Sequence, residues 1–326
     1  MKIAIFHGNE KWILRGLGID IEQSLLNIGI SVSRHEVDLT SPGKIPDADW
    51  FLFVQQGQLD AILGAWGYRN DLVKKSICIF THYVAQNCNH ELLRSIKLVC
   101  HMSSHQMAIS IANGLSIKNS KLIPLGVDMN RHYPLKQKYL TEKLKSLYPE
   151  INNTKKRSYI GFCTRITDKS TYVNRKNYEC LIEVVNKLVN SGENIIIIGD
   201  GWEKIDIKKE ASNLIILCPP YKHFNYFYNL MRLFVSVTSY DGGPIPLLES
   251  MACGVPAVIT NSGFAPDIIQ NRQTGILFQP FESADSVLDH IRVAESINFD
   301  KTYLRGVASQ YSFDNFARKL IKILLK

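Results

Sequence analysis

The stretch Ser239-Tyr-Asp-Gly-Gly-Pro-Ile-Pro-Leu-Leu-Glu-Ser-Met-Ala-Cys-Gly-Val-Pro256 is the most informative part of this sequence. An apolar, β-branched run at residues 233–238 precedes it and predicts a strand buried on both faces, and residues 257–260 predict a second strand. Between the strands, residues 241–244 form a glycine turn, and apolar side chains then recur at helical spacing until Gly254 ends the helix. The stretch therefore predicts a strand, a turn, a helix and a strand.

The turn and the helix combine features of a phosphate-binding site. Gly242 and Gly243 let backbone N–H groups approach a ligand closely, and the helix N-terminus adds the positive end of its dipole. Glu249 lies within the otherwise apolar helix, eight positions after Asp241. Because a buried helix rarely holds a carboxylate without a partner, Glu249 either binds a ligand or pairs with a nearby lysine or arginine.

Length and composition indicate a soluble globular protein of two domains. The 326 residues are 45% hydrophobic and 21% charged, and no apolar run is long enough to span a bilayer. No signal peptide is evident, and seven cysteines without a C-x-x-C pair indicate reduced thiols in the cytoplasm. The net charge is +8, much of it between residues 136 and 157, where either an anionic partner or a solvated linker helix would explain it.

Strands and helices alternate in both halves of the chain, which predicts mostly parallel sheets with helices on both faces. In the first half, strands are predicted at 2–6, 30–37, 50–54, 77–80 and 98–100, with a last short strand and turn at 121–128. Helices are predicted at 19–28 and 104–112, with Gly16 and Gly18 in the loop before the first helix. In the second half, further strands are predicted at 159–163, 194–198, 213–217 and 274–278, and helices at 178–188, 221–228, 283–296 and 313–325. The Lys-rich segment 134–157 is interpreted as a linker, so the domains are placed at 1–155 and 156–310, followed by a C-terminal helix at 311–326.

Several segments resemble retaining glycosyltransferases of the family 4 type, the glycosyl transferases group 1. Asp241 and Glu249 are similar to the donor-site motif E-x7-E of that family, with aspartate in place of the first glutamate. Arg165, followed at a longer interval than usual by Lys176, is similar to the family's G-R…K segment. Residues 198–201, 275–278 and 123–128 are similar to its strand-end glycine loop, its closing strand and its I-P-N-G-V-D segment.

The resemblance implies the GT-B fold, in which two Rossmann-like domains with parallel sheets face a central cleft. It places the nucleotide-sugar donor on the C-terminal domain and the acceptor on the N-terminal domain, and it implies that the last helix crosses back to the first domain. It also implies retaining, metal-independent transfer of a hexosyl group, with no cofactor beyond the donor substrate and no metal site.

The resemblance also assigns roles to individual residues. Glu249 would hold the ribose of the donor and Asp241 its sugar, while Arg165 and Lys176 would stabilise the charge of the leaving diphosphate, with Lys169 as the alternative lysine. His82 would touch the donor sugar, or it is an ordinary loop histidine. The remaining predicted donor contacts are Gly16, Gly18, Gly199, Gly201, Leu217, Pro219, Gly242, Gly243, Pro244 and Ile245.

The expected acceptor is a saccharide or a lipid-linked glycan, modified during cell-surface glycan synthesis at the inner face of the plasma membrane. The basic segment would then meet an anionic membrane, together with Trp12, Trp66, Tyr68, Lys74 and Lys75. Each of these aromatic residues, taken alone, is equally well interpreted as a core residue. Three alternatives stay open. The first is a transferase of the same fold acting on nucleic acid, which the net charge permits and no motif supports. The second is a non-catalytic scaffold, and the third is an NAD-dependent dehydrogenase, for which Gly199-Asp-Gly201 lacks the third glycine.

Overall fold

The computed structural model describes residues 1–8, 13–37, 43–81, 88–151, 153–166, 175–205, 207 and 211–326. They form two compact units: unit 1 comprises Met1–Gly126 with Tyr311–Lys326, and unit 2 comprises Val127–Gln310. The chain thus divides after residue 126, whereas the sequence placed the boundary after residue 155. The C-terminal segment belongs to unit 1.

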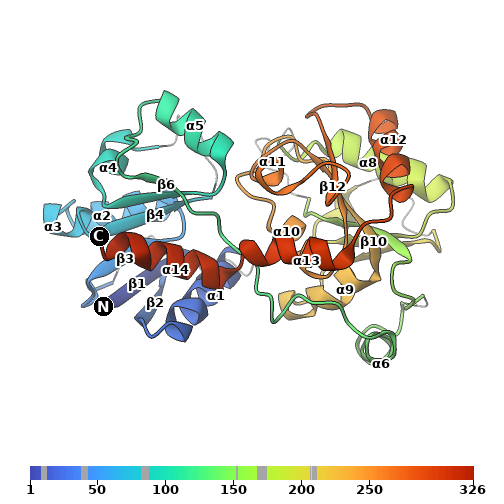
Figure 1. The fold of residues 1–326 in the computed structure, drawn as a ribbon, viewed down its shortest axis with the longest axis horizontal. Coiled ribbons are helices and arrows are strands. Elements are labelled where there is room, and N and C mark those ends of the chain that lie inside the picture. Colours follow the sequence, from blue (N-terminus) through green and yellow to red (C-terminus); the bar gives the residue numbers. More distant parts are fainter. Residues whose placement is uncertain are drawn as a thin grey trace. The chain divides into compact units, whose positions relative to one another are not determined.

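Unit 1 is built on a parallel sheet whose strand order, among the described residues, is β2-β1-β3-β4-β5-β6 (Figure 1). Strand β1 is apolar and buried along its centre, as a strand covered on both faces must be. The strands are β1 (Lys2–Gly8), β2 (Ser31–Val37), β3 (Trp50–Phe53), β4 (Ser76–Phe80), β5 (Leu98–His101) and β6 (Ser120–Leu122). The helices are α1 (Ile13–Asn27), α2 (Gln56–Ala65), α3 (Asn70–Val73), α4 (His90–Ser95), α5 (Ser104–Ala112) and α14 (Phe313–Leu324).

The helices of unit 1 bury their apolar sides against this sheet. Helices α2, α3 and α4 pack leucine, isoleucine and valine side chains against Phe6, Phe51 and Phe53. Helix α1 packs on β1 and β2 and on α14 (Figure 1). Apolar side chains recur along α14 at intervals of three and four residues, so that Phe316 and Leu320 are buried on one side of the helix.

Unit 2 is built on a second parallel sheet, with the order β12-β11-β10-β7-β8-β9 among the described residues. The four isoleucines of β8 are all buried, as expected of a β-branched run in the middle of a covered sheet. Its strands are β7 (Tyr159–Cys163), β8 (Ile195–Ile198), β9 (Leu214–Leu217), β10 (Met231–Ser236), β11 (Ala257–Thr260) and β12 (Gly275–Phe278). Its α-helices are α6 (Gln137–Leu147), α8 (Tyr178–Asn190), α9 (Phe224–Leu230), α10 (Ile245–Ala252), α11 (Ala265–Ile268), α12 (Ala284–Glu295) and α13 (Lys301–Gln310), and its 3-10 turns are η2 (Trp202–Lys204) and η3 (Tyr221–His223).

The helices of unit 2 form two groups. Helices α8 and α12 pack on each other and share one hydrophobic core with β7 and β8, while α10 packs on α9 and α13. Helix α10 is short and apolar, and Pro244 precedes its first residue. The sheet and the α10 group together position the predicted donor-site motif.

The Lys-rich segment at 134–157 is an integral part of unit 2, not a linker. Its leucines recur at helical spacing, so α6 forms and buries Leu140 and Leu144 while its lysines remain in solvent. The side chain of Asn229 also accepts the backbone N–H of Leu135 at 2.8 Å. The lysines mask this amphipathic pattern when the sequence is judged by composition.

Candidate functional site

The carboxyl ends of β7 and β10 mark the point in unit 2 where the strand order reverses. From β7 the chain winds through β8 to β9, and from β10 it winds through β11 to β12 on the other side. Open parallel sheets bind ligands in the crevice beyond the strand ends at such a point. Arg165 follows β7, and Asp241 follows β10. The structure therefore assigns both predicted residues to the same edge of the sheet.

Lys176 and Asp241 form an ion pair at this edge. Lys176 Nζ lies 3.1 Å from Asp241 Oδ2, and the two side chains are 20% and 18% exposed. The neighbouring backbone is joined as well, since the Tyr240 N–H donates to the Arg175 carbonyl at 3.3 Å. The other carboxylate oxygen of Asp241 accepts the Gly243 N–H at 3.3 Å. The carboxylate thus holds together the lysine and the glycine turn.

Arg165 lies in a segment that its neighbours hold in place. The N–H groups of Thr164 and Ile166 donate to the carbonyls of Ile198 and Asp200, each at 2.9 Å. The Tyr178 hydroxyl donates to the Arg165 carbonyl, also at 2.9 Å. This leaves the partly buried Arg165 side chain anchored at its base, at the strand edge.

Gly199 and Gly201 make this close approach possible. Both have a positive φ, of 150° and 80°, and a Cβ on either would lie 2.0 or 2.2 Å from the carbonyl oxygen of Thr164 or Ile166. Their sequence-predicted role was donor contact, and the geometry gives them a packing role beneath Arg165. Leu217, another predicted contact, accepts the Gly199 N–H through its carbonyl at 2.9 Å, and Pro219 is buried.

Residues 242–245 form the turn that leads into α10. Gly242 and Pro244 are buried and Gly243 is partly buried, while Ile245 is the first helical residue. Gly263 crosses this turn so closely that a Cβ on it would lie 2.8 Å from the Asp241 carbonyl oxygen. The backbone of Gly263 therefore packs directly against this turn and limits its movement.

Glu249 is fully buried, and two tyrosine hydroxyls bond to its carboxylate. The Tyr228 hydroxyl donates to Glu249 Oε2 at 2.6 Å, and the Tyr221 hydroxyl donates to Oε1. Burial raises the pKa of Glu249, while the two tyrosine hydrogen bonds and the nearby Arg131 lower it. The sequence offered a ligand or a basic side chain as the partner of Glu249, and its hydrogen-bond partners are tyrosines instead.

His132 completes this buried cluster and was not predicted. Its Nε2 lies 3.9 Å from Glu249 Oε1, and within the described residues neither ring nitrogen has a hydrogen-bond partner. Burial lowers the pKa of His132 to about 3, so the ring is neutral. Nearby, the Arg131 guanidinium lies 5.0 Å from the centre of the Tyr221 ring. The sequence signal for the cluster was limited to the aromatic run at 221–228.

The first-half predictions fare differently. His82 and Trp12 lie outside the described residues, and so does Lys169 in the second half of the chain. Gly16 and Gly18 were predicted in a loop, but they lie inside α1, which begins at Ile13. A Cβ on Gly18 would lie 3.0 Å from the His7 ring, so this glycine serves the close packing of α1 on β1.

The residues proposed for a membrane interface differ in their exposure to solvent. Trp66 is 9% exposed and packs edge-on against Phe6 and Phe51, so it is a core residue, which was the second interpretation of the aromatic residues. Tyr68 is 47% exposed, and its hydroxyl donates to Asp60 at 3.2 Å. Lys74 and Lys75 are exposed.

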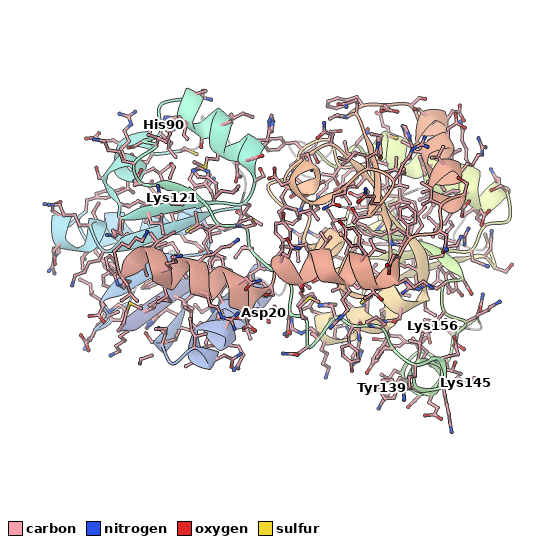
Figure 2. All side chains as sticks on the ribbon, in the orientation of Figure 1. Asp20, His90, Lys121, Tyr139, Lys145 and Lys156 are labelled. Atoms are coloured by element: carbon pink, nitrogen blue, oxygen red, sulfur yellow. The ribbon has the colours of Figure 1, made fainter. Side chains whose placement is uncertain are left out.

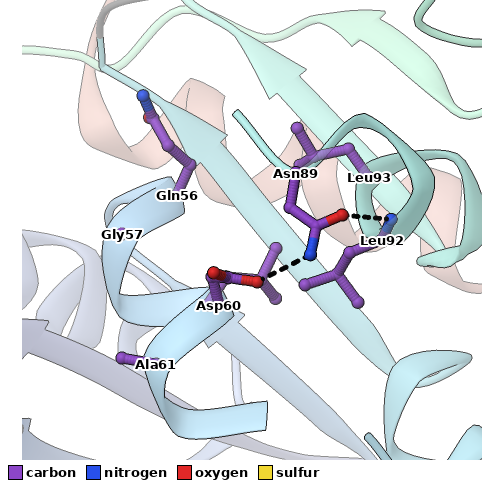
Figure 3. A pocket seen from close by; sticks show the side chains of 8 residues that line it. Gln56, Gly57, Asp60, Ala61, Asn89, Leu92 and Leu93 are labelled. Carbon is purple, nitrogen blue, oxygen red and sulfur yellow. Dashed lines mark hydrogen bonds between the residues drawn. The ribbon is translucent and has the colours of Figure 1, made fainter. Parts of the chain in front are cut away.

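Unit 1 contains a cavity of about 150 Å³ between α2 and α4 (Figure 3). Helix α2 begins just beyond the carboxyl end of β3, so the cavity lies toward the edge of the sheet where ligands bind. The Asn89 side chain donates to Asp60 Oδ1 at 2.9 Å and accepts the Leu92 N–H at 3.1 Å (Figure 3). Gln56, Gly57, Leu59, Ala61 and Leu93 also line it.

Among the described residues, no three histidine, cysteine, aspartate or glutamate side chains gather in a group that could hold a metal ion. No helix in that part of the chain has the length and apolar character needed to cross a membrane.

Known proteins resemble both the second half of the chain and the whole fold. Residues 164–305 match the family model described as Glycosyl transferases group 1, which confirms the resemblance to that broader group for that part of the chain. The O-antigen chain mannosyltransferase B of Escherichia coli is 31% identical over 108 residues, which are 31% of this chain and 27% of that protein. A probable sucrose-phosphate synthase of Thermosipho melanesiensis is 24% identical over 165 residues, or 47% of this chain and 39% of that protein. The chain therefore matches well under half the length of either relative.

Solved structures match along almost the entire chain. Anabaena HepE in complex with UDP-glucose has a TM-score of 0.74 at 15% identity, covering 99% of both chains. Sucrose-phosphate synthase from Thermosynechococcus elongatus has a TM-score of 0.73 at 12% identity, covering 99% of this chain and 98% of that chain. The predicted fold class is confirmed: two Rossmann-like halves with parallel sheets, as in GT-B glycosyltransferases.

Proposed function

We propose that the protein is a glycosyltransferase that moves a sugar from a nucleotide-diphosphate donor to a saccharide or lipid-linked acceptor. The observation that carries the proposal is the meeting of Lys176 and the Asp241–Gly243 turn where the strand order of unit 2 reverses. The family match over residues 164–305 covers this site. HepE, which shares the fold, is a protein whose structure contains UDP-glucose.

In this proposal each residue has a separate task. Arg165 and Lys176 stabilise the negative charge that grows on the diphosphate as the bond to the sugar breaks, and the N-terminus of α10 adds its dipole. Asp241 orients the sugar, and Glu249 accepts a hydrogen bond from the ribose. Cationic side chains take the part that a metal ion plays in other transferases, so we propose metal-independent transfer with retention of configuration. Activity that persists in EDTA, and a product of unchanged anomeric configuration by NMR, are the expected results.

We place the acceptor on unit 1, at the cavity between α2 and α4. Its polar groups, Asp60 and Asn89, suit the hydroxyl groups of a sugar, and the leucines beside them suit the apolar face of its ring. Asp60→Asn is expected to raise the KM for the acceptor about tenfold while the donor KM is unchanged. An equal change in both constants would assign Asp60 to the framework of the unit.

We also propose that the enzyme works in the cytoplasm beside an anionic membrane. Helix α6 presents Lys138, Lys143 and Lys145 to solvent, together with Tyr139, which is 41% exposed. Figure 2 labels Tyr139 and Lys145 on this helix. Each lysine near an anionic surface contributes about 1 kcal/mol. The wild type is expected to float with vesicles containing phosphatidylglycerol and not with neutral ones, and changing the three lysines to glutamine is expected to abolish flotation.

The central experiment is a binding and transfer screen with UDP, GDP and ADP and with their sugar conjugates. A ligand at 100 times its dissociation constant is expected to raise the free energy of unfolding by about 2.7 kcal/mol. The best donor is then tested for hydrolysis and transfer. If no nucleotide stabilises the wild type, the proposal fails and a non-catalytic role is favoured. Steeply salt-dependent binding to DNA or RNA would favour a nucleic-acid acceptor.

A further inference from the structure

Glu249 cannot be reached by a ligand in the arrangement described here. None of its surface is exposed, and each carboxylate oxygen already accepts a tyrosine hydroxyl. A ribose hydroxyl is about the size of a water molecule, so it cannot contact a group that solvent does not reach. One of the atoms covering the carboxylate must therefore move before a ribose can bind.

The two tyrosines differ in their freedom to move. Tyr228 is completely buried in α9, and its ring lies edge-on to Phe224 and Phe234. Tyr221 is only partly buried and lies in the short turn η3, which follows two prolines at the carboxyl end of β9. Tyr221 is thus the less buried of the two tyrosines that cover Glu249.

The charged side chain over the Tyr221 ring has a second partner. Arg131 is also 3.4 Å from Asp128, which continues to pair with it when the ring moves. Phe224 contacts the ring edge-on, with 5.2 Å between ring centres, and the centre of the His132 ring lies 6.0 Å away. Movement of Tyr221 removes a hydrogen bond from Glu249 Oε1, so this oxygen then needs a new donor.

We propose that Tyr221 determines specificity at the donor site: its hydroxyl holds the place on Glu249 Oε1 that a ribose hydroxyl of the donor takes. The inference rests on the proposed function, in which Glu249 binds the ribose. One O–H donor replaces another on the same oxygen, so the buried carboxylate is satisfied in the empty and the occupied site alike. The ribose hydroxyl therefore adds little net affinity in the wild type, because it only replaces the tyrosine.

The test compares ribose with deoxyribose. The nucleoside diphosphate that binds best among UDP, GDP and ADP is titrated by calorimetry, together with its 2′-deoxy and 3′-deoxy forms. In the wild type, removal of either hydroxyl is expected to weaken binding threefold or less. In Tyr221→Phe the carboxylate oxygen lacks its donor, so loss of one of the two hydroxyls is expected to weaken binding about tenfold or more.

Tyr228→Phe is the matched control, because it removes a hydroxyl from the other oxygen of the same carboxylate. Its ratio of ribose to deoxyribose affinity is expected to equal that of the wild type, since the ribose does not reach Oε2. A tyrosine with a purely structural role would lower the melting temperature without moving this ratio.

Two results would overturn the inference while leaving the proposed function intact. One is a wild type that already discriminates tenfold or more, a measurement that needs no variant to fold. The other is a Tyr221→Phe protein that binds the nucleotide with the wild-type ratio. Failure of all three nucleotides to bind the wild type would instead count against the proposed function itself.

Discussion

Lys176 Nζ lies 3.1 Å from Asp241 Oδ2, so a cation and a carboxylate are paired where the strand order of unit 2 reverses. The pair joins residues that are far apart in the chain and follow different strands. A diphosphate arriving at this edge would share the lysine with Asp241, and a sugar would meet the carboxylate. Substitutions of Lys176 and of Asp241 can therefore test the binding of the diphosphate and of the sugar separately.

Replacing Lys176 by alanine is expected to lower kcat/KM for the donor at least about 100-fold, because a cation facing the leaving group is lost. Lys176→Arg keeps the charge and should retain more of the rate. The measurement is steady-state transfer with the donor found in the screen. Lys187→Ala is the control, since Lys187 pairs with Glu183 and Asp285 outside the predicted site. Equal rates for Lys176→Ala and the control would contradict the assignment.

Asp241→Asn is expected to affect the binding of the sugar and the binding of the nucleotide differently. It removes the charge that pairs with Lys176 and so leaves the lysine more available to phosphate, while the sugar loses a strong acceptor. Calorimetry should show affinity for the nucleoside diphosphate unchanged or increased, and affinity for the nucleotide sugar reduced about tenfold. Asp241→Glu restores the charge and tests whether the longer side chain is tolerated. Equal weakening of both ligands would place Asp241 outside the sugar site.

Gly199→Ala is expected to destabilise unit 2 by about 3 kcal/mol or more, because the new Cβ would lie 2.0 Å from the Thr164 carbonyl oxygen. Gly192→Ala is the matched control: its φ is also positive, at 84°, but nothing lies within 4 Å of the added Cβ. This control should cost only about 1–2 kcal/mol. Denaturant unfolding of both variants measures the difference, and similar losses would show that the contact beneath Arg165 relaxes easily.

His132 is expected to make the protein less stable in acid. Its pKa in the folded state is about 3, against 6.5 for an unperturbed histidine, so below pH 6.5 the unfolded chain binds a proton that the folded chain does not. The free energy of unfolding therefore decreases as the pH is lowered below 6.5, and at pH 5 it is about 2 kcal/mol smaller than at neutral pH. Glu249 acts in the opposite sense, because burial raises its pKa and the folded state takes up the proton first.

Comparison with His132→Phe isolates the histidine, since both proteins contain Glu249. Urea unfolding at pH 7 and pH 5 should show a smaller acid loss in the variant. Identical losses in the two proteins would mean that His132 titrates normally in the folded state.

The strands were predictable because a strand buried on both faces consists of a short run of apolar residues. The runs at 159–163 and 257–260 coincide with β7 and β11, since a strand covered on both faces must be apolar throughout. Helices with a clear apolar side, such as α8 and α14, were equally plain. Helix α6 was assigned to a linker because lysines dominate its composition, and α2 was overlooked because its polar residues and glycines obscure its buried leucines.

The candidate site was predictable only in part. The spacing from Asp241 to Glu249 indicated a turn and a carboxylate in a helix, and both are present. The cluster around Glu249 was not predictable, because His132, Tyr221 and Tyr228 come from segments that meet only through tertiary packing. The periodicity of hydrophobic residues within a segment does not predict contacts between distant segments.

The two units differ in chain continuity, and this sets an order for folding during synthesis. Unit 2 is one uninterrupted segment, so all its parts are available once residue 310 has left the ribosome. Unit 1 has its sheet in the first 126 residues but receives α14, the partner of α1, only from residues 311–326. Unit 1 is thus synthesised first but completed last. Until α14 is made, the surface that it will cover on α1 is accessible to chaperones or to another chain.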